Sequence, residues 1–195
     1  MNDYYFTSQW RVPGTIEEVK AILGRPQDMP RWWPSVFLDA VPVEGAENAV
    51  SVTSRGWLPY TLQWELRPRA TEDESTLACD VSGDLEGDGI WKLEQQGPTV
   101  AITFDWSVGV NKAAFDLLSP ALRPLFESNH RWAMRQGEIS LRLELARRRA
   151  QSEIEKAVIA GPPEPPDDGK FWLAVGTVAF ALLFVGRKLR KKCRR

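Results

Sequence analysis

The chain contains a single histidine and only two cysteines. One histidine, with no cluster of other ligand side chains at metal-binding spacing, argues against a metal site, and we expect no cofactor. Cys79 and Cys193 cannot form a disulfide framework. The sequence also lacks a glycine-rich phosphate loop, a nucleophile elbow and a readable arrangement of serine or cysteine with histidine. No motif marks the chain as an enzyme, so we lean towards a non-catalytic function.

Acidic and basic residues nearly balance over the whole chain, but they are unevenly distributed. The formal net charge of −1 combines 25 basic with 26 acidic residues. The segment from Phe171 to Arg195 holds 7 of the basic residues and none of the acidic ones. The remainder is therefore acidic, which gives no electrostatic reason to expect a nucleic-acid partner.

The overall composition is that of a globular protein with an excess of tryptophan. Hydrophobic residues make up 43% and charged residues 26% of the chain, which excludes wholesale disorder and a polytopic membrane protein. Most of the 9 tryptophans lie in the first two-thirds of the sequence. Such large amphipathic rings indicate an aromatic-lined interior or mouth.

The longest run without charged side chains extends from Phe171 to Gly186. As a helix it would span about 24 Å, against about 30 Å for the hydrocarbon core of a bilayer. Lys170, Arg187 and Lys188 can reach the interface with their charged ends, and Leu189 can extend the span. The run can therefore cross a membrane with the help of its flanks.

We predict a transmembrane helix over residues 171–189 and a basic tail over residues 190–195, both in contact with membrane lipid. Residues 158–170 are rich in proline and predict a linker between this helix and the preceding domain. The alternative is a buried core helix, which the shortness of the run favours. The basic tail, however, suits a membrane surface better than the edge of a core.

The membrane orientation follows from two opposing features. Basic residues after the apolar run favour a cytoplasmic C-terminus, which would place the domain outside. Residues 1–6, however, show no secretory signal, and a folded domain without one is difficult to translocate. We expect a tail-anchored, single-pass membrane protein whose domain lies in the cytoplasm.

The body of the chain begins with alternating patterns that predict mainly strands. Apolar side chains at every second position predict a strand over residues 4–12. Thr15 and Glu18 form a capping-box signature at the start of a helix. Alternation then predicts antiparallel strands between about residues 50 and 109, joined by short turns that include one at Gly87-Asp88-Gly89.

Helical periodicity follows the strands. We predict a short helical segment near residues 112–118 and a long helix from Ser119 to about Lys156, with Pro120 at its first position. The order of strand, helix pair, about six strands and long helix predicts α+β architecture. The expected fold is a curved antiparallel sheet of about seven strands whose apolar face wraps around the long helix.

Two amides, Asn129 and Gln136, interrupt the apolar face of the long helix. At about 100° per residue, both lie near the centre of the stripe formed by Leu122, Leu125, Phe126, Trp132, Ala133, Ile139 and Leu143. A buried amide without a partner costs about 1–3 kcal/mol. The two amides therefore either anchor a largely apolar ligand inside a cavity or bond to backbone groups or trapped water.

Few other side chains are candidates for chemistry. His130 lies at the edge of the same stripe, where a solvent-facing or packing role is favoured over that of a general base. Cys79 has inward strand parity, so we expect a buried and inert thiol. We do not expect a pair of carboxylates inside the fold, because the acidic side chains of the predicted strands alternate onto the outward face. They are Glu65, Asp80, Asp84, Glu94 and Asp105.

Several of these segments resemble the SRPBCC superfamily, also called the START or polyketide cyclase/lipid-transport superfamily, which has the helix-grip fold of the birch-pollen allergens. The resemblance covers about residues 4–149, within a domain that we place at residues 1–157. It rests on Trp32-Trp33-Pro34, Arg55-Gly56-Trp57-Leu58-Pro59-Tyr60, the segment Gly83 to Trp91, Phe104-Asp105-Trp106, and Asn129-His130 with Met134 and Gly137.

The resemblance implies a deep cavity between the sheet and the long helix that takes an apolar or aromatic ligand. The iron ligands of the oxygenase members have no counterpart in a chain with one histidine. His130 is the only candidate for a catalytic group. We expect ligand contacts from Trp33, Trp57, Tyr60, Trp64, Trp91, Phe104, Trp106, Asn129, Trp132 and Gln136.

Three functions fit these features. The first is a membrane-anchored binding module for a hydrophobic small molecule, such as a lipid, an isoprenoid or a quinone, and the inward aromatic rings favour it. The second is an enzyme of the polyketide cyclase or dehydratase type, in which Asn129 and His130 handle protons. The third is a scaffold whose interior is filled by its own side chains, which a cavity below about 300 Å³ would favour.

Overall fold

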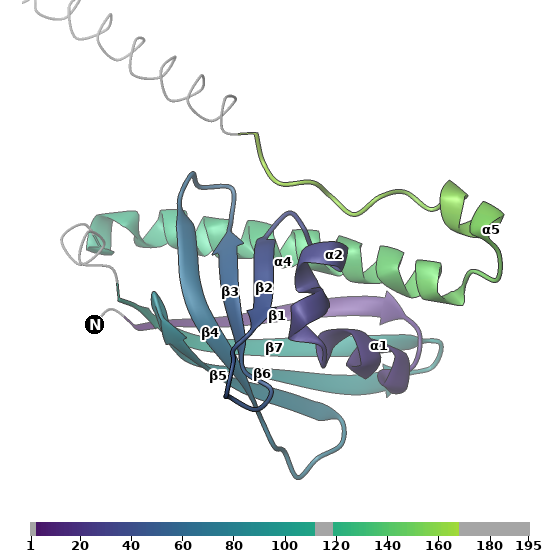
Figure 1. Ribbon diagram of the computed structural model, residues 1–195, viewed down its shortest axis with the longest axis horizontal. Coiled ribbons are helices and arrows are strands. Elements are labelled where there is room, and N and C mark those ends of the chain that lie inside the picture. The colour runs from purple at the N-terminus through teal and green to yellow at the C-terminus, as the bar shows by residue number, and fades with distance from the viewer. Residues whose placement is uncertain (1–2, 112–118, 168–195) are drawn as a thin grey trace, which may run out of the picture. The chain divides into compact units, whose positions relative to one another are not determined.

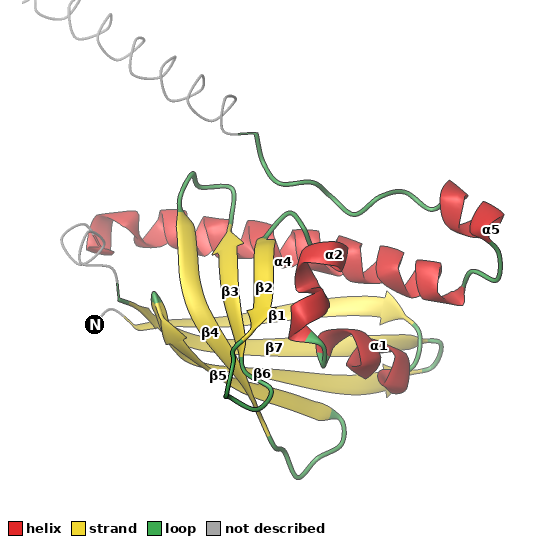
Figure 2. Ribbon diagram, viewed as in Figure 1, coloured by secondary structure: helices red, strands yellow, loops and turns green. Residues whose placement is uncertain are grey.

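The computed structural model describes residues 3–111 and 119–167 and shows an α+β fold with one seven-stranded antiparallel sheet (Figures 1 and 2). The sheet order is β1-β7-β6-β5-β4-β3-β2, so every strand pairs with its sequence neighbour except β1, which pairs with the last strand, β7. The strands are β1 (Asp3–Pro13), β2 (Phe37–Pro42), β3 (Val50–Arg55), β4 (Thr61–Arg69), β5 (Thr76–Gly83), β6 (Leu85–Gln96) and β7 (Thr99–Val110).

The described helices lie between β1 and β2 and after β7. Three short ones connect β1 to β2, namely α1 (Ile16–Leu23), the 3₁₀ helix η1 (Pro26–Asp28) and α2 (Met29–Trp32). The long helix α4 (Ser119–Arg149) packs along the curved sheet and is followed by the short α5 (Glu153–Val158) (Figure 1). This arrangement of a curved antiparallel sheet around one long helix is the helix-grip fold that the element order predicts.

Helix α4 also protects the free edge of β1. The backbone N–H of Arg11 donates to Glu138 Oε1 at 3.1 Å, and the guanidinium of Arg142 donates to the backbone oxygen of Arg11. Glu138 and Arg142 form an ion pair at 2.7 Å, one helical turn apart. The side chains of α4 thus bond to β1 backbone groups that a neighbouring strand would otherwise take, which guards against edge-to-edge association.

A buried carboxylate joins α2 to the C-terminal half of α4. The side chain of Glu144 is only 3% exposed and accepts two hydrogen bonds from Arg31, at 2.7 and 2.9 Å. Arg148 donates a third, at 2.7 Å. Burial alone would raise the pKa of Glu144, but the hydrogen bonds from the two arginines outweigh it, and the pKa lies below its ordinary value.

We expect Glu144→Gln to lower the free energy of unfolding by about 2 kcal/mol, because the amide cannot balance the two guanidinium groups that converge on it. This loss is smaller than that expected for a wholly buried ion pair, because the Arg31 side chain is 56% exposed and can be solvated by water when its partner is removed. Urea unfolding measures the effect. The control is Glu65→Gln, which breaks an exposed pair with Arg67 and should change stability by less than about 0.5 kcal/mol. Equal effects of the two substitutions would contradict this role.

Two segments of the sheet differ from their prediction. Strand β2 was not predicted, because only Phe37 among its residues is buried and its exposure pattern does not alternate. The Gly87-Asp88-Gly89 segment lies inside β6 rather than in a turn, and the reversal of the chain falls between Gly83 and Leu85 instead. Gly89 suits a strand here because the rings of Phe104 and Trp106 cross it so closely that they leave no room for a Cβ.

The long helix is shorter than predicted. It ends at Arg149, and the predicted continuation to Lys156 is a separate helix, α5. The break has a local cause, since Ser152 caps α5 by accepting a hydrogen bond from the backbone N–H of Glu155 at 3.2 Å. The helical segment predicted near residues 112–118 lies outside the described residues.

The chain forms two compact units, residues 1–165 and residues 166–195. Of the second unit only Pro166 and Asp167 are described. The predicted transmembrane helix and basic tail, residues 171–195, therefore lie outside the described residues. Within the described part of the chain, no helix is both long and apolar enough to span a bilayer.

Candidate ligand cavity

A largely apolar cavity of about 320 Å³ lies in the domain between the sheet, α2 and α4. Six of the aromatic residues expected to contact a ligand line it, namely Trp33, Tyr60, Trp64, Trp91, Phe104 and Trp106. Two polar residues of the long helix, Asn129 and His130, line it as well. The volume lies at the lower end of the range for small-molecule sites, about 300–1,000 Å³. The tryptophans therefore do not fill the interior completely.

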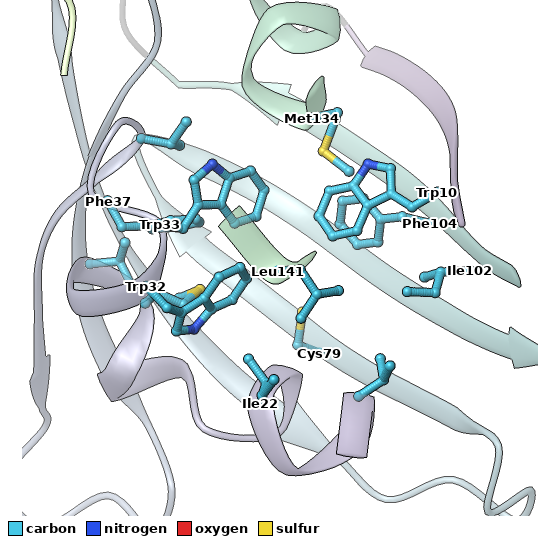
Figure 3. Close-up of a cluster of buried hydrophobic side chains, with 14 of the residues drawn as sticks. Trp10, Ile22, Trp32, Trp33, Phe37, Cys79, Ile102, Phe104, Met134 and Leu141 are labelled. Carbon is cyan, nitrogen blue, oxygen red and sulfur yellow. The ribbon is translucent and has the colours of Figure 1, made fainter. Parts of the chain in front are cut away.

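Seven aromatic side chains form a closed series, which we call the aromatic belt, and all of them except Trp10 line the cavity. Each ring contacts the next, at centroid distances between 3.9 and 6.4 Å, and the last contacts the first. Part of the belt is visible in Figure 3, where Trp10 and Phe104 lie beside Met134 of α4, and Trp33 and Phe37 lie farther from it. In order, the belt is Trp10, Trp33, Phe37, Trp64, Trp106, Phe104 and Trp91.

Three of the expected ligand contacts do not line the cavity. Trp57 is half-buried in the loop between β3 and β4. Trp132 packs at the margin of the hydrophobic core, and Gln136 is also half-buried. Neither of the two helical residues reaches the cavity, which receives Ala133 and Met134 instead.

The buried face of α4 is rotated from its predicted position. In the second half of the helix the buried side chains are Met134, Ser140, Leu141, Glu144 and Leu145, whereas the predicted Ile139 is 41% exposed. The predicted stripe contained only apolar residues and the two amides, whereas Glu144 lies on the buried face because hydrogen bonds from Arg31 and Arg148 make its burial possible. The true stripe still has helical spacing.

Asn129 bonds to the backbone across one end of the cavity. Its Oδ1 accepts a hydrogen bond from the backbone N–H of Leu58 at 3.2 Å. A Cβ on Gly56 would lie about 2.1 Å from the same oxygen, so only glycine fits there. The amide therefore fastens the loop between β3 and β4 to α4, which is the backbone-bonding role that the sequence left open.

His130 faces the cavity and contacts β1. Its ring stacks on Phe6 with a centroid distance of 4.1 Å, and its Nε2 lies 3.1 Å from Ser8 Oγ. Burial, and secondarily the charge of Arg131, lowers the pKa of His130 to about 4, so the imidazole is neutral at neutral pH. The pairing with Ser8 could not be read from the sequence, because the two residues are 122 positions apart and nothing local links them.

The phenol of Tyr60 stays protonated over the physiological range. Burial, and secondarily the neighbouring Tyr4, raises the pKa of Tyr60 to about 12. Its ring makes an edge contact with Phe126 of α4 at a centroid distance of 6.3 Å. Tyr60 is therefore a neutral polar group on the cavity wall, able to donate one hydrogen bond and to accept others.

Exposed lining residues mark where the cavity opens. They are Gly24, after α1, and Pro68, Arg69 and Thr71, at the end of β4, while every other described lining residue is buried or half-buried. The Lys20 side chain of α1 donates to the backbone of the connection between β4 and β5. A ligand would therefore enter between α1 and this connection, a route that alternation in the sequence did not reveal.

Cys79 lines the cavity as a buried thiol. It is 8% exposed, and burial raises its pKa to about 12. We expect a Cys193→Ser chain to react with a disulfide reagent such as Ellman's reagent at least about a hundredfold more slowly when folded than when unfolded in urea, because only the thiolate reacts. Similar rates in the two states would contradict the buried position.

The site offers no evident holder for a metal ion. Across residues 3–111 and 119–167, no group of three or more histidine, cysteine, aspartate or glutamate side chains converges. Apart from the guanidinium groups of Arg55 and Arg69, which would repel a cation, the polar side chains that line the cavity are neutral. The arrangement is therefore suited to hold and orient an apolar molecule through ring contacts and a few hydrogen bonds.

No protein-family profile and no curated protein matches the sequence. The ZhuI aromatase/cyclase from Streptomyces sp. R1128 matches with a TM-score of 0.64 and 12% identity, over 78% of this chain and 99% of that one. StfQ, a di-domain ARO/CYC of the steffimycin biosynthetic pathway, matches with a TM-score of 0.52 and 16% identity, over 77% of this chain and 52% of that one. Norcoclaurine synthase from Thalictrum flavum matches with a TM-score of 0.51 and 11% identity, over 76% and 98%. At such low identities these similarities show the fold alone, which the chain shares with these aromatase/cyclase structures and norcoclaurine synthase.

Proposed function

We propose that the protein binds a small, largely apolar molecule containing one or a few rings in the cavity between the sheet and α4. The aromatic belt around a cavity of about 320 Å³ carries this proposal. Its rings offer large apolar surfaces with defined stacking geometry. The modest volume favours a compact ligand, such as a quinone or isoprenoid head group, over a lipid with two acyl chains.

We also propose that the chain is tethered to a membrane, with its domain on the cytoplasmic side. The uncharged run from Phe171 to Gly186 and the basic residues that follow it support the tether alone. The cytoplasmic side rests instead on the difficulty of translocating a folded domain. A tether would hold the cavity near a reservoir of apolar molecules. Fractionation tests this part separately, since the full chain should sediment with membranes and a chain truncated after residue 167 should not. Protease treatment of sealed vesicles would then show on which side of the membrane the domain lies.

Filling the cavity should abolish binding. Ala133 lines the cavity on α4, and Ala133→Phe would place a benzyl group inside it. We expect this change to weaken the binding of tetralin, a compact two-ring hydrocarbon, by at least about tenfold, because the ligand loses the space that buries it. Isothermal titration of the full chain measures the effect.

Ala146→Phe is the matched control, because Ala146 is exposed on the same helix and does not line the cavity. It should leave the affinity for tetralin within about twofold of the wild type. If tetralin does not bind the wild-type chain, or if both variants bind it as well as the wild type, the cavity is not a ligand site.

A second candidate function is an enzyme of the cyclase or dehydratase type. The observation that favours it is the neutral imidazole of His130 on the cavity wall, hydrogen-bonded to Ser8. A pKa of about 4 makes this imidazole a weak base, however, whereas an efficient general base has a pKa near the working pH. Binding without catalysis therefore remains the better-supported proposal.

A further inference from the structure

The opening of the cavity is bordered by α1 on one side and, on the other, by residues 70–75, which connect β4 to β5. Helix α1 is fixed to α4. Glu18 accepts hydrogen bonds from Arg149 at 2.6 and 2.7 Å, and Arg148 donates to the backbone oxygen of Ala21 at 3.2 Å. The α1 side of the opening is therefore held in place by the long helix.

The connection on the other side is compact but lies outside the sheet. None of residues 70–75, all of which are described, is paired with a neighbouring strand. The carboxylate of Asp73 accepts hydrogen bonds from the N–H and hydroxyl of Ser75 and from the hydroxyl of Thr76, at 2.7 to 2.9 Å. The backbone of the connection is bonded to β6 only at its end, where the N–H of Leu93 donates to the oxygen of Ser75 at 2.9 Å. The connection can therefore move as one unit about this end.

The side chain of Lys20 joins the two sides of the opening. Its Nζ donates to the backbone oxygen of Glu74, 54 positions later in the chain. Within α1 and residues 70–75, both described in full, this is the single hydrogen bond that links one side with the other. Lysine side chains are mostly exposed, but that of Lys20 is half-buried, because it lies between the helix and the connection.

The bond between Lys20 and Glu74 lies close to the exposed residues of the opening. The N–H of Gly24, one of these residues, donates to the backbone oxygen of Lys20 at 2.9 Å, so the two lie one helical turn apart. Hydrogen bonds from Ser75, then from Thr76, and to a smaller extent the charge of Lys20 lower the pKa of Asp73. An ionised carboxylate therefore lies near the ammonium group and helps to keep it at the connection.

We propose that the bond between Lys20 and Glu74 is a latch that controls how fast a ligand enters and leaves the cavity. While the latch is closed, residues 70–75 lie against α1. When it breaks, they move away from α1 and the ligand passes. Because the bond forms with or without a ligand inside, it sets the rates of exchange rather than the affinity. This inference rests on the proposed function, since it concerns access to the same cavity.

Lys20→Met tests the latch, because methionine keeps most of the apolar part of the side chain but removes the ammonium group. One hydrogen bond changes an equilibrium about fivefold, so association and dissociation of tetralin should both become about fivefold faster. The dissociation constant should stay within about twofold of the wild type. Exchange measurements by nuclear magnetic resonance on the full chain give the dissociation rate, and isothermal titration gives the affinity.

The matched control is Lys156→Met, which removes the same charge from α5. Lys156 is exposed, pairs with Glu153 at 2.8 Å and does not line the cavity. This change should leave both rates within about twofold of the wild type, since an exposed pair away from the opening contributes little.

A second variant tests the latch in the opposite direction. In a chain with Lys20→Cys, Glu74→Cys and Cys193→Ser, a short bis-maleimide can join the two sides of the opening, while the buried Cys79 stays unreacted. Tetralin should then dissociate at least about tenfold more slowly than from the same chain before cross-linking, because the two sides can no longer separate.

The result separates the latch from the ligand site. If tetralin binds but exchanges at the same rate in the wild type, in Lys20→Met and in the cross-linked chain, the cavity is a ligand site and the latch is wrong. If Lys20→Met speeds dissociation and weakens the affinity by the same factor, Lys20 stabilises the bound state, which overturns the latch. If tetralin does not bind the wild-type chain, the proposed function fails and the latch fails with it.

Discussion

Replacing Gly137 by alanine is expected to lower the free energy of unfolding by about 2–4 kcal/mol, although alanine is favoured over glycine in a helix by about 1 kcal/mol. Gly137 faces the belt on α4. A Cβ at this position would lie 2.4 Å from Trp33 and 2.7 Å from Trp10. Both rings are rigid and buried, so they cannot move aside without disturbing the belt. Urea unfolding followed by circular dichroism measures the effect.

The control for Gly137 uses the same helix. Ala146 is exposed, so Ala146→Gly should cost about 1 kcal/mol, which is the helix-propensity difference alone. Opposite substitutions would then both destabilise the protein, one through crowding and one through propensity. If Gly137→Ala instead stabilised the protein, the close approach of α4 to the belt would be wrong.

Acid should destabilise the protein in part through His130. Its pKa is about 4 in the folded protein, against 6.5 as the ordinary value. Between these values the unfolded chain binds a proton that the folded chain excludes, so the free energy of unfolding falls as the pH falls from about 6.5 to about 4. One pKa unit corresponds to about 1.4 kcal/mol, so the loss from this group approaches about 3 kcal/mol.

His130→Phe isolates this contribution, because it keeps a ring stacked on Phe6 but removes the titrating group. We expect the free energy of unfolding of the wild type to fall by about 2–3 kcal/mol more than that of the variant between pH 7 and pH 4. Carboxylates such as Glu144 titrate in both chains and cancel in the comparison. Parallel pH profiles would show that His130 is not buried as described.

The fold could be predicted from the sequence because most of its elements have strong local patterns. The alternation over residues 4–12 marked β1. Thr15 and Glu18 form the capping box that they indicated, with both of its hydrogen bonds present. Strand β2 escaped prediction, since its residues are mostly exposed on both faces of an edge strand. The alternation of apolar and polar residues reflects which side chains are buried. A strand with few buried side chains therefore shows no clear alternation in the sequence.

The candidate site was only partly predictable for a different reason. The rings of Trp64 and Trp106 face the cavity as strand parity indicates, because parity is a local property. The buried face of α4 depends on Arg31, which lies 113 positions before its partner Glu144. The contact between Ser8 and His130 likewise arises only when distant segments meet. Such pairings have no signature in a single sequence.

The central claim is that the space between the sheet and α4 receives a ligand. The most direct test is an isotope-filtered nuclear Overhauser measurement between unlabelled tetralin and the labelled full chain. The account predicts contacts from the ligand to Phe104, Trp106 and Met134, which line the cavity from both sides. Contacts confined to exposed apolar residues such as Ile154 and Val158 would contradict it.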